Sequence, residues 1–183
     1  QATYTIGRWD FTAGERYAHE APKIDSYVNF AIPLFGIGVT FPYGAKTSFN
    51  ASTPMGSVTF HPSRETSVYG TIARGYKAGG FNFDRVQSSN GLCSGGSGIT
   101  PVNDTSFPGE FVDSWELGAK TTWAGGNLLF NAALFHQKYS NFQLNSFLGT
   151  SFVVRSIPEV VSKGLDAELL WQPKAVPGLM LQT

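Results

Sequence analysis

The chain has 183 residues and a formal net charge of zero at pH 7. Charged residues make up only 14% of it, against about 25% in a typical soluble domain, and aromatic residues make up another 14%. The neutral charge leaves no electrostatic footprint for nucleic acid, and no apolar stretch reaches the roughly 18 residues that a transmembrane helix needs. These properties exclude a nucleic-acid-binding protein and a helical membrane protein.

The N-terminal residues 1–6 contain neither an initiator methionine nor the basic start and apolar run of a signal peptide. We therefore expect the chain to begin inside a longer protein. The single cysteine, Cys93, cannot form a disulfide within the chain. It is either a free thiol or half of a bridge whose partner lies outside the chain.

Alternation of apolar and polar residues dominates the sequence, and helical periodicity is nearly absent. In chain order, this pattern predicts strands at about 9–18, 53–61, 66–77, 115–123, 128–135 and 163–172. The clearest strand is 115–123, where Trp115 and Trp123 end one apolar face while Glu116 and Lys120 lie on the other. The strand over 128–135 has a less polar second face.

Short and long breaks alternate between these strands. The short breaks lie at 62–65, 124–127 and 173–178, and the long ones at about 19–52, 78–111 and 140–161. A membrane β-barrel has tight periplasmic turns at one rim and long extracellular loops at the other. A soluble β-sandwich has no reason to segregate loop lengths in this way.

Strand length favours the barrel as well, because a tilted strand needs about ten residues to cross a bilayer and soluble strands commonly have about five or six. In a barrel, the apolar faces would meet lipid, and the faces that carry Glu116, Lys120, Asp166 and Glu168 would line the lumen. Trp and Tyr near the strand ends would form girdles at the membrane interfaces. In a soluble sandwich, the same aromatic residues would be core residues.

No constellation of residues predicts catalysis or metal binding. His19, His61 and His136 are scattered over different segments, and no serine sits in a Gly-x-Ser-x-Gly elbow. The glycine-rich run 75–82 lacks the Gly-Lys-Ser/Thr ending of a phosphate loop, so its glycines are expected to let the chain turn sharply at a strand end. We expect no enzyme activity, no cofactor and no metal site.

Several segments, read in order, resemble the barrel of TonB-dependent receptors. The strongest match is 67–77 continuing into 78–82, which is similar to a family strand that runs into an "RGYKAGGFN" loop. The other matching segments are 11–17, 108–110, 115–120, 131–135, 139–143, 163–169 and 177–179. Two departures are Glu15, at a usually apolar position that would face lipid, and Ile157-Pro158, where the family often has an asparagine-containing segment.

The resemblance implies an all-β fold, namely an antiparallel transmembrane β-barrel segment with about eight or nine strands of a barrel of about 22. Residues 1–183 would then be part of the barrel domain, with the plug domain and the C-terminal closing strands outside the chain. An open sheet in lipid would leave its edge groups without hydrogen-bond partners. We therefore expect the segment to function only within the larger protein.

The resemblance also implies a function in the cell outer membrane of a Gram-negative organism. The parent would bind a scarce nutrient, a siderophore-type iron complex above all, and import it with energy coupled through TonB. Other ligands of the family are haem, cobalamin and some carbohydrates. The implied partners are outer-membrane lipid, TonB, the plug domain and a small ligand such as a ferric siderophore.

Candidate ligand-binding residues lie at the strand tops, because aromatic and amide groups suit polar ligands with apolar faces. They are Tyr76, Lys77, Phe81 and Asn82 in the glycine-rich loop, and Asn141 and Gln143 at the next rim. Two alternatives remain open at this point. One is a small passive outer-membrane barrel that acts as an anchor or adhesin, and the other is a soluble carbohydrate-binding β-sandwich.

Overall fold

The computed structural model describes residues 1–32, 37–82, 105–147 and 152–183, and the regular structure in these ranges is entirely β-strand. Eight strands form the main antiparallel sheet, in the order β1-β2-β7-β8-β11-β12-β13-β14. The strands are β1 (Ala2–Ile6), β2 (Trp9–Gly14), β3 (Tyr17–Glu20), β4 (Lys23–Ile32), β5 (Ile37–Lys46), β6 (Phe49–Ser52), β7 (Met55–Ser63), β8 (Thr66–Lys77), β9 (Gly80–Phe81), β10 (Ser106–Phe107), β11 (Glu110–Trp123), β12 (Leu128–Phe147), β13 (Phe152–Trp171) and β14 (Leu181–Gln182). The predicted all-β antiparallel fold is confirmed.

Three long hairpins account for most of the structure, because the short strands continue the main strands in the same register. The first hairpin pairs β2, β3 and β4 with β7, β6 and β5. The second pairs β8 and β9 with β11 and β10, and the third pairs β12 with β13. Within each hairpin, the residue numbers of the two partners in every pair have the same sum. No residue is therefore inserted where a strand is interrupted.

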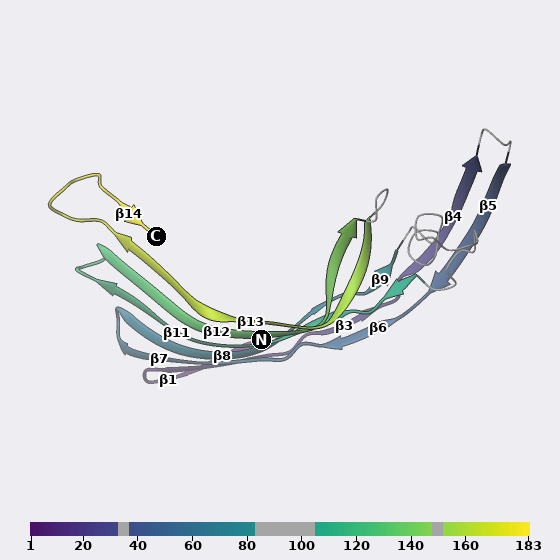
Figure 1. Ribbon diagram of the computed structural model, residues 1–183. Helices are drawn as coiled ribbons and strands as arrows, with labels where there is room; N and C mark the ends of the chain where they lie inside the picture. Colours follow the sequence, from purple (N-terminus) through teal and green to yellow (C-terminus); the bar gives the residue numbers. More distant parts are fainter. Residues whose placement is uncertain (33–36, 83–104, 148–151) are drawn as a thin grey trace.

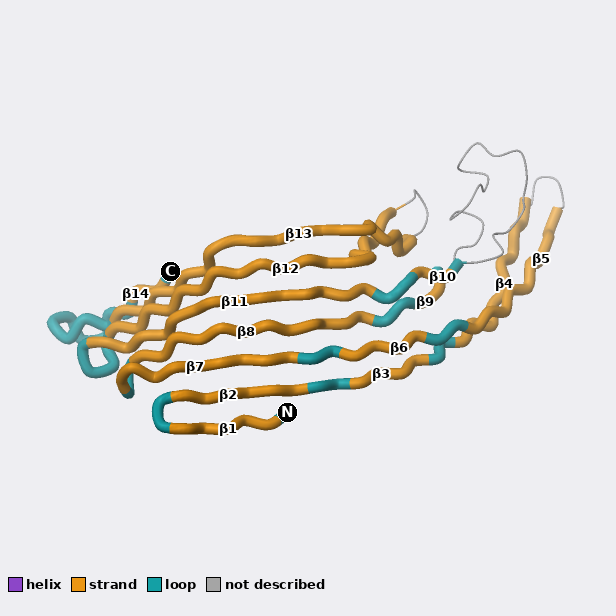
Figure 2. Tube along the Cα trace, turned by 90° about the horizontal axis from the view of Figure 1, so that it is seen from below, coloured by secondary structure: helices purple, strands orange, loops and turns teal. Residues whose placement is uncertain are grey.

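The connections between strands differ at the two ends of the main sheet: they are short turns at one end and extended hairpins at the other, where the sequence predicts long loops. Short turns join β1 to β2, β7 to β8 and β11 to β12 at one end, while the tips of the three hairpins lie at the other (Figure 2). Glycine is required in two of these turns, since Gly7 and Gly126 have φ angles of 61° and 95°. The end with the short turns corresponds to the periplasmic rim of a membrane barrel.

β11, β12 and β13 are longer than predicted, and β3 to β6 occupy the first expected long break, which corrects the expected long breaks; β8 has the predicted bounds. Most described residues of 19–52, 105–111 and 140–161 belong to strands, and β12 and β13 have 20 residues each. The reason is that the apolar–polar alternation ends where one face no longer meets an apolar medium. The pattern therefore marks the apolar band of a strand and misses its extension beyond that band.

The main sheet is a single curved layer with two accessible faces (Figure 1). Among the described residues, the buried hydrophobic side chains are Ile24, Ala51 and Val153, which lie toward the hairpin tips, whereas many large apolar side chains of the main sheet are exposed. A soluble β-sandwich would bury one face of each sheet against another sheet, so that alternative is wrong. Over the described ranges, no helix has the length and hydropathy of a membrane span.

Candidate functional site

One face of the main sheet, here called the apolar face, carries uninterrupted rows of nonpolar residues. Paired residues of antiparallel strands share a face, so each row can be followed from strand to strand. One row consists of Tyr4, Phe11, Val58, Gly70, Leu117, Leu134 and Leu165. Leu117 is 53% exposed and Leu165 65% exposed, with no protein packed over them. Such a face suits contact with lipid.

Tryptophans and charges mark the borders of the apolar face. On β11 its outward positions run from Trp115 to Trp123, as predicted, and Trp115 stacks on His136 with ring centroids 5.6 Å apart. The next outward row toward the hairpin tips is charged, with Arg74 3.6 Å from Asp113. Glu15, expected to face lipid, belongs to this level and accepts a hydrogen bond from Ser52 Oγ. A carboxylate just beyond the apolar band avoids the cost of burial in lipid.

The opposite face, here called the polar face, holds hydrogen bonds between neighbouring strands. Tyr69 Oη donates to Glu116 Oε1 at 2.5 Å, and Asn131 Nδ2 donates to Glu168 Oε2 at 3.0 Å. Both pairs line a hollow of about 490 Å³ that also includes Lys120 and Asp166. The four charged residues predicted to face the lumen therefore share this face.

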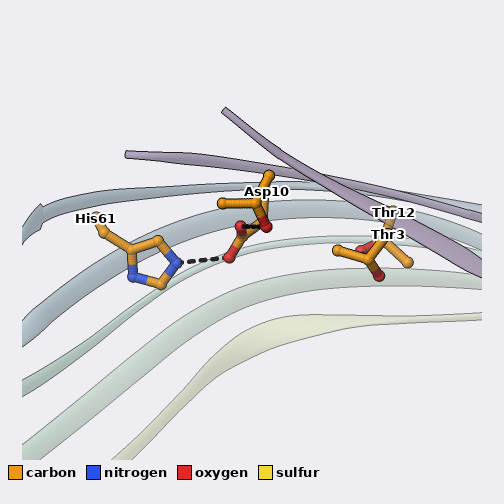
Figure 3. A network of polar contacts seen from close by, with 5 residues as sticks. Thr3, Asp10, Thr12 and His61 are labelled. Atoms are coloured by element: carbon orange, nitrogen blue, oxygen red, sulfur yellow. Dashed lines mark hydrogen bonds and ion pairs between the residues drawn. The ribbon is translucent and has the colours of Figure 1, made fainter. Parts of the chain in front are cut away.

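A second polar group lies nearer the N-terminus. Asp10 accepts hydrogen bonds from Thr5 Oγ1 at 2.6 Å and pairs with His61 Nε2 at 2.9 Å, beside the Thr3–Thr12 hydroxyl pair (Figure 3). His61 thus pairs with a carboxylate across two strands. Over the described ranges, no group of three or more His, Cys, Asp or Glu side chains is placed to hold a metal ion.

Gly118 on the polar face leaves room for the ring of Tyr69, and this gives a first prediction. A Cβ at position 118 would lie 2.5 Å from Tyr69 Cζ, so Gly118→Ala is expected to destabilise the sheet by about 1–3 kcal/mol through overpacking. Urea unfolding of the complete protein in lipid vesicles measures the effect. Gly118→Ala combined with Tyr69→Ala should cost less than the sum of the two single changes; an additive result contradicts the predicted contact.

The predicted ligand-binding residues lie toward the hairpin tips, and two of them join neighbouring hairpins. Asn82 Nδ2 donates to the carbonyl of Val154 at 3.1 Å, and Asn82 Oδ1 accepts from the amide of Val154 at 2.6 Å. Gln143 Nε2 donates to the carbonyls of Ala78 at 2.8 Å and Pro108 at 3.1 Å. The second and third hairpins are thereby connected.

The other four predicted residues have different surroundings. Tyr76 packs with its ring 5.0 Å from that of Phe111, and its buried hydroxyl has no hydrogen-bond partner among the described residues. Lys77 is exposed at the end of β8, and Phe81 is half-buried in β9. Asn141 has a φ of 55° and interrupts the pairing of β12 opposite Pro158, which cannot donate a backbone hydrogen bond.

Sequence reasoning did not single out Glu110 and Phe49, which complete this junction. Glu110 Oε2 accepts a hydrogen bond from the amide of Gln143 at 2.7 Å. The ring of Phe49 from the first hairpin packs on Gly79, where an added Cβ would lie 2.5 Å from Phe49 Cζ. We call the contact region of Phe49, Gly79, Asn82, Glu110, Gln143 and Val154 the collar.

The glycine-rich run has a different role from the one predicted. The chain does not turn sharply there, because β9 continues the register of β8 and pairs with β10. Gly79 is needed for close approach, since its Cβ would also lie 2.4 Å from the carbonyl oxygen of Phe107. The expected sharp turn is thus wrong. Cys93 and residues 83–104 lie outside the described residues.

A curved antiparallel sheet with one apolar face, one polar face and short turns at one end is typical of the wall of a membrane β-barrel. The family model described as "TonB dependent receptor-like, beta-barrel" matches residues 1–182, so the chain belongs to this family. It is accordingly a protein of the cell outer membrane. No curated protein matches the sequence.

Solved receptors of similar fold include three with low sequence identity. The ferric yersiniabactin uptake receptor FyuA of Yersinia pestis has a TM-score of 0.69 at 18% identity, over 96% of this chain and 23% of that one. The ferric-catecholate import receptor Fiu of E. coli K12 has a TM-score of 0.60 at 20% identity, over 96% of this chain and 24% of that one. The alcaligin outer-membrane receptor FauA of Bordetella pertussis has a TM-score of 0.56 at 17% identity, over 96% of this chain and 26% of that one. The chain therefore spans about a quarter of the length of these receptors.

Proposed function

We propose that the chain is part of an outer-membrane receptor that imports a scarce nutrient with energy coupled through TonB, and that a siderophore-type iron complex is the ligand. The observation that carries the proposal is the family match over residues 1–182. The ligand class is supported by two receptors of similar fold, since FyuA takes up ferric yersiniabactin and Fiu imports ferric catecholates. The alternative of a small passive barrel has no comparable support.

Residues 1–183 form part of the barrel domain in this proposal. A plug domain and the closing strands belong to other parts of the receptor, and TonB acts on it from the periplasmic side. The ligand passes through without covalent change, because a receptor of this kind binds and releases its cargo. No catalytic residue is assigned.

The ligand-binding surface that we propose lies at the collar and beyond it, on the side of the hairpin tips. Lys77 offers an exposed ammonium group that attracts anionic iron complexes, and Tyr76, Phe81 and Asn141 lie at the same end of the sheet. Asn82 and Gln143 contribute by holding the second and third hairpins together. Preorganised hairpins lose less conformational entropy when a ligand binds, which favours affinity.

Ligand titration of the complete receptor, purified in detergent, tests the ligand class. Tryptophan fluorescence is followed while ferric hydroxamate, ferric catecholate, haem, cobalamin and an oligosaccharide are added separately. We expect saturable binding of at least one ferric siderophore. Saturable binding of only haem, cobalamin or the oligosaccharide would contradict the ligand class and leave the family unchanged.

A further inference from the structure

A groove crosses the apolar face over β1, β2, β7, β8 and β11. Its floor lies over the smallest residues of this part of the face, Ala13, Gly56 and Gly70. The groove has a volume of about 730 Å³ and is bounded by Tyr4, Phe11, Val58, Ile72 and Trp115. All of these side chains belong to outward rows of the sheet, so the groove opens toward lipid.

Neither backbone conformation nor close packing explains the two glycines of the floor. Neither glycine has a left-handed φ angle. A Cβ at Gly70 would meet nothing within 4 Å, and a Cβ at Gly56 would meet only Ile72 Cγ1 at 3.7 Å. Gly79 and Gly118, by contrast, are each required by a contact closer than 3 Å. The glycines at 56 and 70 therefore keep an outward space open that larger side chains could fill.

Toward the hairpin tips, the groove adjoins a second hollow of about 450 Å³. This hollow shares Gly56 and Ile72 with the groove and reaches Arg74 and Asp113. Arg74 belongs to the charged row beyond Trp115, and its side chain is 44% exposed. The guanidinium lies 4.6 Å above the ring of Phe111 and 3.6 Å from Asp113, which is longer than a hydrogen bond. The path thus begins between apolar side chains and ends at a cation.

We propose that this groove binds one phosphate-bearing lipid of the outer leaflet, with an acyl chain over Gly56 and Gly70 and the phosphate at Arg74. An acyl chain fills an apolar groove in a membrane-facing wall, and a guanidinium donates paired hydrogen bonds to phosphate. Glu15 and Asp113 lie at the level of Arg74, so the head of the site is not strongly cationic. The acyl chain therefore contributes most of the affinity and Arg74 the selectivity.

Photocrosslinking of the complete receptor in lipid nanodiscs tests the acyl-chain part. A photoreactive amino acid replaces either Val58, which lines the groove, or Leu134, which lies in the same row outside it. The lipid probe is phosphatidylglycerol. We expect a yield at position 58 about 3-fold or more above that at position 134, because a bound chain stays longer than a bulk one.

A Cβ at position 70 would meet nothing within 4 Å, so Gly70→Leu should fill the groove and reduce the yield at position 58 to that at position 134. Ala132→Leu, on the same face but outside the groove, should leave it unchanged. Equal yields at 58 and 134 in the unaltered protein, or no response to Gly70→Leu, would overturn the proposal. The gel mobility shift of a folded barrel confirms that each variant is folded.

Arg74→Gln tests the phosphate part in nanodiscs that contain both phosphatidylglycerol and diacylglycerol. The ratio of crosslinked phosphatidylglycerol to crosslinked diacylglycerol at position 58 should fall about 3-fold, because a partly exposed charged contact contributes only modestly to binding. Lys138→Gln is the matched control, since Lys138 is also outward and paired with a carboxylate, Glu159, at 2.8 Å. An unchanged ratio in Arg74→Gln, or an equal fall in both variants, would contradict the role of Arg74. Neither crosslinking test requires transport or a nutrient ligand.

Discussion

Leu165→Arg is expected to destabilise the folded receptor by about 2 kcal/mol or more, because an arginine on the lipid-facing side of a barrel is costly near the middle of the membrane. Leu165 lies in the outward row with Leu117 and Leu134 and is 65% exposed. Urea unfolding of the complete receptor in lipid vesicles gives the change in the free energy of unfolding.

Ser162→Arg is the matched control for this change. Ser162 lies on the same strand, β13, but lines the hollow on the polar face near Asp166. An arginine there remains in contact with water and carboxylates, so the expected change is within about 0.5 kcal/mol. Equal destabilisation by the two substitutions would contradict the assignment of the faces.

Asn82→Ala combined with Gln143→Ala is expected to separate the second and third hairpins at the collar. The two changes remove two side-chain hydrogen bonds at Val154 and two at Ala78 and Pro108. Each such bond contributes about 0.5–1.5 kcal/mol net, so the loss of the four bonds should lower the free energy of local protection by about 2–6 kcal/mol. Hydrogen exchange at the amide of Val154, which donates to Asn82 Oδ1 in the unaltered protein, measures this loss.

Asn145→Ala serves as the control for the collar, because Asn145 is exposed on the same strand as Gln143. Its substitution should leave the exchange of the Val154 amide unchanged. Unaltered exchange in the double variant would show that the hairpins are held together by other contacts. Weaker ligand affinity in the double variant alone would link the collar to the binding surface.

The apolar band was the part of the fold that could be predicted. Trp115 and Trp123, with Glu116 and Lys120 between them, gave both the strand and the two faces, because a lipid–water difference across a strand imposes a period of two. The charged row at Arg74 and Asp113 lies in the same strands but carries no such alternation. The parts of β11, β12 and β13 beyond the apolar band therefore could not be read from the pattern, whereas the end of β8 at Lys77 was predicted.

The collar was found only in part, for a related physical reason. Aromatic and amide residues at the strand tops directed attention to Asn82 and Gln143, but their partners are backbone groups of Val154, Ala78 and Pro108. Contacts to the backbone leave little trace in the side chains of the partner residues. Gly79 was noted as a turn residue, and its close contact with Phe49 depends on pairing between hairpins that the sequence alone does not specify.

The most direct test of active import is the uptake of radioactive iron by cells that produce the complete receptor. Cells with intact TonB and matched cells without it receive the ferric siderophore that binds in the titration. The account predicts that iron accumulates only in the cells with TonB, while surface binding is the same in both. Equal accumulation with and without TonB would contradict energy-coupled import and indicate a passive route through the membrane.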